Sequence, residues 1–266
     1  MSQLVVYGHT GMVGSQLYRW LRERGADVAG VSLDRCDGEI GVPEWAFLCL
    51  PTLTGEHGEQ NQAALWEVCD GWQGRPLRVV VRSTVLPGTC ERLRRAHSEL
   101  TIYHWPEFLS ARTAWADFIT PRVRFVGCNM LPKVVAAWQQ DIEPLLPVAV
   151  EMTRYMSAAT SETIKYAHNA HGAMQIIYAN QMYDVCNAVG ADWQQVHDCL
   201  PQLGYVSHRQ MASYWDVWKD NKRGYGGTCF PKDVGALRAW LHGLRQPCEL
   251  LDGMEAANAR LRGVTR

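Results

Sequence analysis

The sequence predicts an α/β fold: a doubly wound, mainly parallel sheet with helices on both faces, followed by an all-helical region built on a long central helix. Short apolar runs alternate with helical patterns over about the first 150 residues, which is typical of strands joined by crossover helices. Residues 161–189 then keep a helical pattern without a proline, which is long for a globular helix. We therefore expect an α/β domain at residues 1–154 and a helical domain at residues 155–266.

Each strand is predicted by a short apolar run that ends at a polar or turn residue. The first helix is expected from residue 12 to residue 24, because Val13, Leu17 and Leu21 lie on one face and Gly25 ends it. Strands are expected at residues 4–7, 27–31, 46–50, 78–81, 101–103 and 124–126, with a further helix at residues 62–69.

In the second half of the chain, Gly190 is expected to end the long helix. Asp192, followed three residues later by Gln195, has the spacing of a capping box, so the next helix should begin there. The rest of the chain is expected to be helical, apart from a glycine turn at residues 226–227 and its surroundings.

The composition indicates an ordinary globular protein whose 266 residues can form a sizeable core. The formal net charge of −1 gives no reason to expect a nucleic-acid or membrane partner, and no apolar run is long enough to span a bilayer. The nine cysteines are an odd number without a C-x-x-C pair, which favours reduced thiols in the cytoplasm over disulfides. No metal centre is expected from their spacing.

A glycine-rich turn follows the first predicted strand and opens the first predicted helix. Glycines at this place let a ligand approach the backbone, and the helix N-terminus attracts a dinucleotide pyrophosphate. The alternative is a tight turn without a ligand, since the spacing is G-x-x-G-x-x-G and not the usual G-x-G-x-x-G. We expect a Rossmann-like site whose cofactor contacts Gly8, Thr10, Gly11, Met12, Val13 and Gly14.

The residues after the second predicted strand leave the choice of cofactor open. Ser32 stands where an acid would bind the ribose hydroxyls of NAD, and Asp34 follows two residues later. Arg35 beside it would suit the 2′-phosphate of NADP. We therefore expect Asp34 and Arg35 at the cofactor, which is NAD or, as the alternative, NADP.

Two more motifs lie at the ends of predicted strands, where parallel sheets bind ligands. Ser83 and Thr84 come directly after one strand. Glu107 follows the next, where a carboxylate can act as a general base. Taken singly, these are also typical of a polar strand end and an exposed glutamate.

On the long helix, Glu162, Lys165 and Asn169 lie on one face because they are three and four residues apart. A lysine and an amide aimed at one site can stabilise an oxygen that gains negative charge. The alternative is a solvated helix face with one ion pair.

The most informative motif is GGTCFPKD at residues 226–233. Cys229 follows two glycines, with Lys232 three residues on and Asp233 four residues on. A cysteine at a turn near a cation has the setting of a nucleophile, whereas a lone cysteine is more often a small buried apolar residue.

Together these motifs resemble those of the nucleotide-sugar 6-dehydrogenases, the UDP-glucose and GDP-mannose dehydrogenase family. The matching runs are RSTVLPGT (82–89), PEFL (106–109), SETIKYAHN (161–169) and GGTCFPKD (226–233). Four runs in the right order over roughly 230 residues, with the glycine turn before them, make the resemblance specific.

The resemblance implies a four-electron oxidation of a sugar's C6 alcohol to the carboxylate with two nicotinamide molecules. Cys229 would be the nucleophile, forming a thiohemiacetal and then a thioester that water hydrolyses. Glu107 would assist hydrolysis, Lys165 and Asn169 would stabilise the oxyanion, and Asp233 and Thr84 would handle water and protons.

Further contacts are expected on the same basis. Additional cofactor contacts are Pro51, Thr52, Ser83, Thr84 and Lys232. Substrate contacts are Glu107, Phe108, Leu109, Lys165, Asn169, Arg209, Tyr225, Gly226 and Cys229. The long helix would form a homodimer, with Arg209 reaching the substrate of the partner subunit.

The chain also departs from the family pattern. It stops soon after the helices that follow Cys229, so the nucleotide-binding C-terminal domain of the family is expected to be missing, and only about ten residues separate Asp34 from the next strand. Trp105 replaces an asparagine, and residues 110–112 lack the family's second glutamate. The alternatives are a two-electron hydroxyacid or sugar-alcohol dehydrogenase of similar topology, or a binding protein without turnover.

Overall fold

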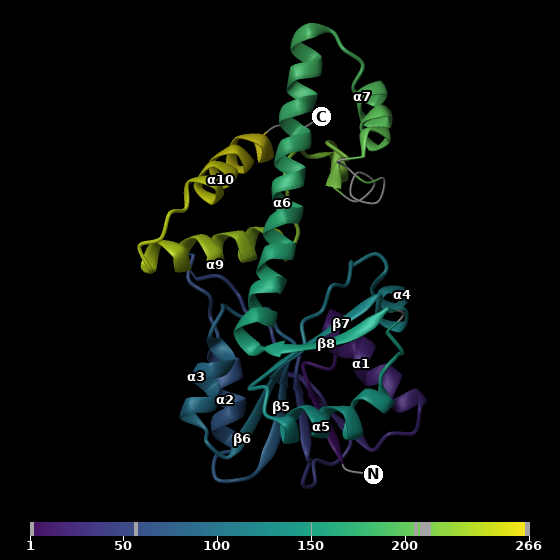
Figure 1. Ribbon diagram of the computed structural model, residues 1–266, viewed down its shortest axis with the longest axis vertical. Helices are drawn as coiled ribbons and strands as arrows, with labels where there is room; N and C mark the ends of the chain where they lie inside the picture. Colours follow the sequence, from purple (N-terminus) through teal and green to yellow (C-terminus); the bar gives the residue numbers. More distant parts are fainter. Residues whose placement is uncertain (1–2, 56–57, 150, 205–206, 208–213, 264–266) are drawn as a thin grey trace. The chain divides into compact units, whose positions relative to one another are not determined.

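The computed structural model describes residues 3–55, 58–149, 151–204, 207 and 214–263 (Figure 1). Its contacts divide the chain into two compact units. The first unit holds residues 1–53 and 60–165, and the second holds residues 54–59 and 166–266. The first unit thus continues beyond residue 154, where we expected the domain boundary, because a further strand and the first turns of the long helix pack with the sheet.

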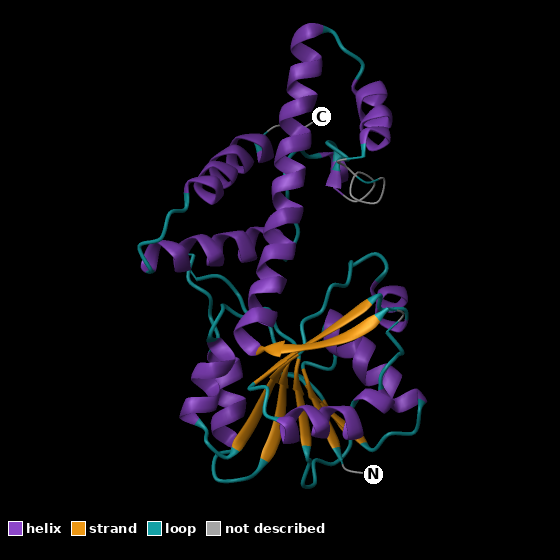
Figure 2. Ribbon diagram, in the orientation of Figure 1, coloured by secondary structure: helices purple, strands orange, loops and turns teal. Residues whose placement is uncertain are grey.

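The first unit is built on an eight-stranded sheet with the order β3-β2-β1-β4-β5-β6-β7-β8 (Figure 2). Neighbouring strands are parallel except for the pairs β2–β3 and β6–β7, which confirms the prediction of a mainly parallel sheet. The strands are β1 (Leu4–Tyr7), β2 (Val28–Val31), β3 (Cys36–Asp37), β4 (Trp45–Leu48), β5 (Leu77–Val81), β6 (Leu100–His104), β7 (Val123–Cys128) and β8 (Met152–Ser157).

Helices cover both faces of this sheet, because alternate residues of each strand point to opposite sides. Leu4 and Val6 of β1 belong to a core shared with α1, α4 and α5, whereas Val5 belongs to a core shared with α2 and α3 (Figure 1). The helices are α1 (Met12–Glu23), α2 (Ala63–Gly71), α3 (Thr89–Ala96), α4 (Ala114–Ile119), α5 (Pro132–Asp141) and the 3-10 turn η1 (Glu143–Leu145).

Two strands were missing from the prediction, and each has a physical reason. β8 contains no fully buried side chain and is held at the sheet edge by six backbone pairs with β7. β3 is only two residues long and pairs antiparallel with the end of β2. Between Val31 and Trp45 the described chain holds only this short strand and no helix, which agrees with the trimmed connection expected there.

The second unit is helical and continues the long helix of the first. α6 (Ala158–Val189) has 32 residues and confirms the predicted long helix, although it begins three residues earlier. Asp192 caps α7 (Trp193–Cys199) by accepting the N–H groups of Gln194 and Gln195, as the capping motif predicted. The other elements are η2 (Leu200–Leu203), η3 (Lys219–Asn221), α9 (Phe230–Gly243) and α10 (Glu249–Arg262).

The core of the second unit joins α6 to α9 and α10. Ile177 of α6, Val234 of α9 and Met254 of α10 belong to one buried cluster. A second buried cluster contains Trp215 and Ala179, and Ala179 lies farther along α6. None of the described helices combines the length and the hydropathy needed to cross a bilayer.

Candidate functional site

The glycine turn between β1 and α1 has the tight geometry that its sequence predicted. Gly8 has φ +78°, and a Cβ there would lie 2.3 Å from the carbonyl oxygen of Cys49. A Cβ on Gly14 would lie 2.2 Å from the carbonyl oxygen of Gly8. Gly11 caps α1 without a side-chain hydrogen bond, so the first turn of this helix keeps N–H groups for an anion.

A hydrogen-bonded network lies beside this turn and involves residues that the sequence analysis did not assign. The Ser32 hydroxyl accepts from the Thr10 hydroxyl at 2.9 Å and lies 3.0 Å from Nδ1 of His9. Nε2 of His9 lies 3.1 Å from the Asp37 carboxylate. Gly30 leaves room for the buried His9 ring, since a Cβ there would lie 2.6 Å from the imidazole. A glycine inside a strand was the sequence signal for this close approach.

The predicted cofactor residues Asp34 and Arg35 lie on the exposed turn between β2 and β3. The Arg35 guanidinium donates to the Asp37 carboxylate at 2.5 Å. This hydrogen bond is the main reason why the pKa of Asp37 lies below its ordinary value. Asp37, and not Asp34, is therefore the acid that joins the network beside the glycine turn.

The ends of β4 and β5 are tied together by the hydroxyl residues predicted there. The Ser83 hydroxyl accepts from the Leu50 N–H at 2.9 Å and donates to the Leu50 carbonyl at 2.7 Å. The Thr52 hydroxyl donates to the Thr84 carbonyl at 2.8 Å. These bonds hold the loop that begins at Pro51 against the next strand. The hydroxyls of Ser83 and Thr52 are thus already engaged within the chain.

A buried ion pair joins the loop after β6 to α6. Nζ of Lys165 lies 3.2 Å from Oε1 of Glu107, and both side chains are less than a tenth exposed. The Leu109 N–H donates to the other carboxylate oxygen at 2.7 Å. Burial opposes ionisation of Glu107, but the Lys165 charge and the Leu109 bond outweigh it, so its pKa lies below the ordinary value. Glu107 is a carboxylate at neutral pH.

Aromatic rings complete the surroundings of this pair. Nζ of Lys165 lies 5.3 Å from the ring centroid of Phe108, and Phe108 packs edge-on against Phe125. Leu109 packs against the core that covers the α1 face of the sheet. The predicted substrate residues Phe108 and Leu109 therefore lie directly beside Glu107 and Lys165.

Arg82 and Trp105 form a buried stack that the sequence analysis missed. The Arg82 guanidinium lies 3.6 Å from the Trp105 ring centroid, and its Nε and Nη1 atoms have no hydrogen-bond partner among the described residues. Burial lowers the pKa of Arg82, and its charge helps to keep Glu107 ionised. An arginine at the end of an apolar strand was the available signal. The sequence places Arg82 at the start of the RSTVLPGT motif and indicates no role of its own.

Glu162 differs from its neighbours on α6. Its two carboxylate oxygens accept the N–H groups of Gly88 at 2.6 Å and Cys90 at 2.8 Å, at the beginning of α3. Complete burial raises its pKa. Glu162 therefore caps a helix, and it does not share the environment of Lys165.

In the second unit, Asn169 and Asp233 form a buried polar pair. Nδ2 of Asn169 donates to Oδ2 of Asp233 at 2.6 Å, and both residues are buried. Lys232 makes a short ion pair with the other oxygen of Asp233. The structure thus brings Asn169, Lys232 and Asp233 together across 64 residues of sequence.

Cys229 stands at the N-terminus of α9, immediately before Phe230. Gly227 has φ +76°, which turns the chain into this helix, and the Thr228 hydroxyl lies 3.8 Å from the Cys229 sulfur. The side chain of Cys229 is partly exposed. Asp233 follows one helical turn later, and its N–H donates to the Cys229 carbonyl at 2.9 Å.

The residues before this turn are fixed by α10. The Tyr225 side chain, predicted to bind substrate, is buried in the core, and its hydroxyl donates to Glu255 at 2.7 Å. Burial, with help from Glu255, raises the pKa of Tyr225. A Cβ on Gly226 would lie 3.0 Å from the Arg262 guanidinium. The predicted crossing arginine, Arg209, lies outside the described residues.

Comparison with known proteins identifies relatives of this chain. Residues 159–260 match the model of the UDP-glucose/GDP-mannose dehydrogenase family, central domain. The UDP-glucose 6-dehydrogenase of Rickettsia typhi is 27% identical over 226 residues, which cover 80% of this chain and 48% of that protein. The chain spans about half the length of the curated relatives it matches.

Two solved structures share the fold. A UDP-glucose dehydrogenase from Pyrobaculum islandicum is 19% identical with a TM-score of 0.81, over 98% of this chain and 68% of that one. The 3-hydroxyisobutyrate dehydrogenase of Mycobacterium tuberculosis is 16% identical with a TM-score of 0.72, over 100% of this chain and 95% of that one. Both likenesses confirm the Rossmann-like α/β fold followed by a long helix.

The glycine turn gives a first testable prediction. Gly14→Ala should lower the free energy of unfolding by about 1–3 kcal/mol, because the new Cβ meets a backbone oxygen that no side-chain rotation can clear. Gly71→Ala in α2 is the control, since nothing lies within 4 Å of its Cβ, and it should be neutral or stabilising by up to about 1 kcal/mol. Urea unfolding of the two variants checks this, and equal midpoints would contradict it.

The buried ion pair gives a second prediction. Glu107→Gln leaves the Lys165 ammonium buried without a counter-charge and should destabilise the protein by about 3–5 kcal/mol. Glu107→Gln combined with Lys165→Met should cost less than the sum of the single variants in urea unfolding. The exposed pair Arg19–Glu23 is the control, with a coupling of about 0.5 kcal/mol or less. Additive effects of the Glu107 and Lys165 variants would refute an energetically coupled pair.

The ion pair between Glu107 and Lys165 also makes the stability of the protein depend on pH. Because the folded-state pKa of Glu107 is depressed, its contribution to stability is present at neutral pH and is lost as the pH falls through that pKa. The stability difference between wild type and Glu107→Gln should therefore shrink in acid. A difference that stays constant from neutral pH into the acid range would show that Glu107 does not titrate as an ion-pair partner.

Proposed function

Because the chain belongs to the UDP-glucose/GDP-mannose dehydrogenase family, we propose that it oxidises the C6 alcohol of a nucleotide sugar of the UDP-glucose type to the carboxylate. The observation that carries the proposal is the buried hydrogen bond between Asn169 and Asp233. It joins the long helix to the helix that begins at Cys229. The family match includes these three residues together with Lys165.

NAD is the proposed cofactor, and the turn at residues 8–14 supports it. Gly8 and Gly14 leave no room for a Cβ, and the uncapped first turn of α1 suits a pyrophosphate. Asp37 lies in the hydrogen-bonded network beside this turn and can accept from ribose hydroxyls. Arg35 is already paired with Asp37, which favours NAD over NADP because a 2′-phosphate needs an available cation. A bound nicotinamide would supply the hydride acceptor for both oxidation steps.

Cys229 is the proposed nucleophile. Loss of a hydride from C6 and of the hydroxyl proton first converts the alcohol to an aldehyde. The Cys229 sulfur then attacks the carbonyl carbon, a carbon–sulfur bond forms, the thiol gives up its proton, and the carbonyl oxygen takes up a proton to give a thiohemiacetal. Removal of a hydride from that carbon and of the proton from its hydroxyl leaves a thioester. Water then adds to the thioester, and the carbon–sulfur bond breaks to give the carboxylic acid and the free thiol. The partly exposed position of Cys229 at a helix N-terminus supports this role.

The buried polar residues are assigned to the charges and protons of these steps. Glu107 is ionised at neutral pH, so it can accept a proton from the attacking water. Lys165 and Asn169 are four residues apart on α6 and therefore lie on one helix face, from which both can donate to a developing oxyanion. Asp233 orients the Asn169 amide, and with Thr84 it is assigned to water and proton handling.

A two-electron hydroxyacid dehydrogenase is the second candidate function. The likeness to 3-hydroxyisobutyrate dehydrogenase favours it, because that fold matches over 95% of its own length. This alternative requires no cysteine. Counting reduced cofactors per substrate separates the two, with two expected for a nucleotide-sugar oxidation and one for a hydroxyacid.

Replacement of the proposed nucleophile gives a fourth prediction. Cys229→Ser should reduce carboxylate formation from UDP-glucose with NAD by at least about a thousandfold, while NAD binding measured by calorimetry stays unchanged. Cys199→Ser, at an exposed cysteine of α7, is the matched control and should behave as wild type. Acid formation at the wild-type rate by Cys229→Ser would exclude the covalent route. Binding of NAD and sugar without turnover by wild type would indicate a binding protein.

We also propose a homodimer formed through α6. Tyr178, Val185 and Val189 are 47%, 52% and 72% exposed, and their spacing of seven and four residues puts them on one helix face. An apolar face of this kind gains stability when a second copy covers it.

The dimer proposal gives a fifth prediction. Val185→Asp places a charge in the exposed apolar face and should shift the mass measured by sedimentation from dimer toward monomer. Asn187→Asp carries the same charge on the opposite side of the helix, about 200° around its axis, and should leave the mass unchanged. A monomeric wild type, or a Val185→Asp dimer of unchanged stability, would contradict this interface.

A further inference from the structure

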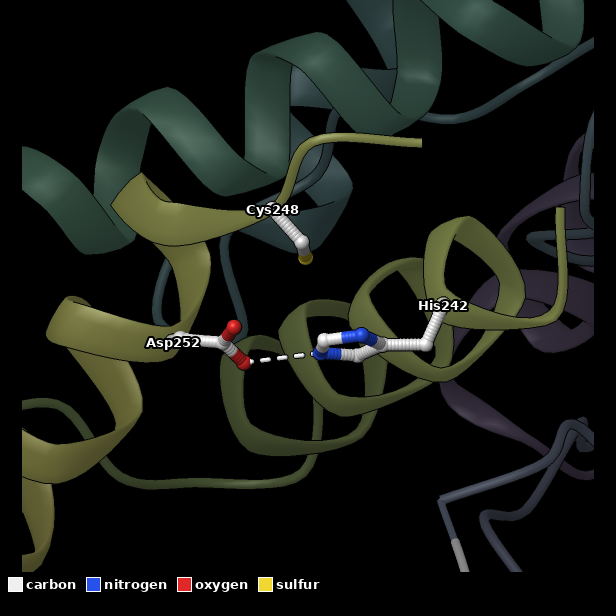
Figure 3. Close-up of side chains that lie close together, drawn as sticks. All are labelled: His242, Cys248 and Asp252. Atoms are coloured by element: carbon white, nitrogen blue, oxygen red, sulfur yellow. Dashed lines mark hydrogen bonds and ion pairs between the residues drawn. The ribbon is translucent and has the colours of Figure 1, made fainter. Parts of the chain in front are cut away.

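His242, Cys248 and Asp252 converge at the junction of α9 and α10, and none of them has a role in the proposed function (Figure 3). Their ligand atoms all lie within 4.8 Å of one another. Nε2 of His242 lies 2.9 Å from Oδ1 of Asp252, and the Cys248 sulfur points toward both side chains. The cluster joins an imidazole nitrogen, a sulfur and a carboxylate oxygen.

The local fold brings these three residues together. His242 lies in the last turn of α9, and Cys248 is the N-cap of α10. The Asp252 N–H donates to the Cys248 carbonyl at 2.9 Å, so these two side chains are one helical turn apart on the same face. Val234 and Leu251 pack α9 against α10 in the buried core of the second unit, which fixes the backbone on both sides of the cluster.

We propose that His242, Cys248 and Asp252 form a binding site for Zn²⁺ or a similar thiophilic divalent cation. Nitrogen, sulfur and carboxylate oxygen are the three kinds of ligand that zinc binds in proteins, and three protein ligands leave a fourth position for water. Ligands of a tetrahedral zinc are about 3.5 Å apart, and rotation of the exposed His242 side chain closes the remaining distance. The thiolate selects against Mg²⁺ and Ca²⁺, which prefer oxygen ligands.

Arg238 also contacts the Asp252 carboxylate, and this contact determines which carboxylate oxygen is left for the cation. Its Nε atom makes a short ion pair with Oδ1 of Asp252, the same oxygen that faces His242. Oδ2 is the carboxylate oxygen left for the metal. On binding, the metal takes the place of the hydrogen bond between His242 and Asp252, and the Cys248 thiol releases its proton as the sulfur–metal bond forms. Arg238 then holds the carboxylate in position from the other side.

A cation at this place would connect the two helices that pack on each other. Its ligands come from the end of α9 and the beginning of α10, so binding should stabilise the second unit against unfolding. Cys229 and Asp233 lie at the opposite end of α9, which makes the site independent of the proposed chemistry. The role expected for this cation is structural.

Cobalt substitution of the full chain tests the site. After treatment with a chelator, wild type titrated with Co²⁺ should show thiolate-to-cobalt charge transfer and tetrahedral d–d absorption at one equivalent, and Zn²⁺ should abolish both bands. Cys248→Ser should lose the charge-transfer band, and Asp252→Asn should weaken Co²⁺ binding by more than about tenfold. Saturating Zn²⁺ should raise the melting temperature of wild type and not that of Cys248→Ser.

The exposed sequence His197-Asp198-Cys199 provides the control. It offers the same three residue types, with His197 2.9 Å from Asp198, but does not form a three-ligand cluster. Cys199→Ser should keep the full cobalt spectrum. A spectrum that survives in Cys248→Ser, a spectrum without a thiolate band, or equal binding of Mg²⁺ would overturn the proposal. Circular dichroism of Cys248→Ser and Asp252→Asn excludes loss of folding as the cause of lost binding.

Discussion

The ion pair between Lys165 and Glu107 is the constraint on which the polar site of the first unit depends. A lysine that is about one-twentieth exposed needs a counter-charge, because an isolated buried ammonium is costly. Glu107 supplies that charge from the loop after β6, and the Leu109 N–H fixes its second oxygen. The pair therefore sets where this loop meets α6. The Lys165 charge and the Leu109 N–H also keep Glu107 ionised, so the contacts that position the carboxylate also set its protonation state.

Three buried carboxylates illustrate how partners decide what an acid can do. Glu107 faces an ammonium, Asp233 faces an amide and an ammonium, and Glu162 accepts backbone N–H groups at the beginning of a helix. Spacing along α6 put Glu162 on the same face as Lys165 and Asn169. The segment that contacts each turn of α6 decides the role, and that segment is remote in sequence. Helix periodicity thus identifies a face but not the chemistry on it.

Local patterns predicted the elements that local interactions determine. Asp192 caps α7 as expected, and α6 has the length that its uninterrupted pattern indicated. β8 escaped prediction because its stability comes from backbone pairing with β7 and not from apolar side chains. The stack of Arg82 on Trp105 was not predicted for a related reason. Its two residues come from successive strand ends, and no spacing in one segment connects them. Tyr225 was assigned to substrate from its neighbourhood in sequence, whereas the packing of α10 draws its side chain into the core.

The short connection after β2 shows how a trimmed chain can still place an acid beside the glycine turn. The expected position at the end of β2 holds Ser32, and counting onward along the sequence points to Asp34. The chain reverses instead, and β3 pairs antiparallel with β2 so that Asp37 lies opposite Gly30. Because Gly30 has no side chain, His9 fits against it and reaches the Asp37 carboxylate. The register between β2 and β3, and not the distance along the chain, therefore determines where the Asp37 carboxylate lies. The same hairpin holds Arg35 on that carboxylate, so the guanidinium and the acid are paired at one edge of the sheet.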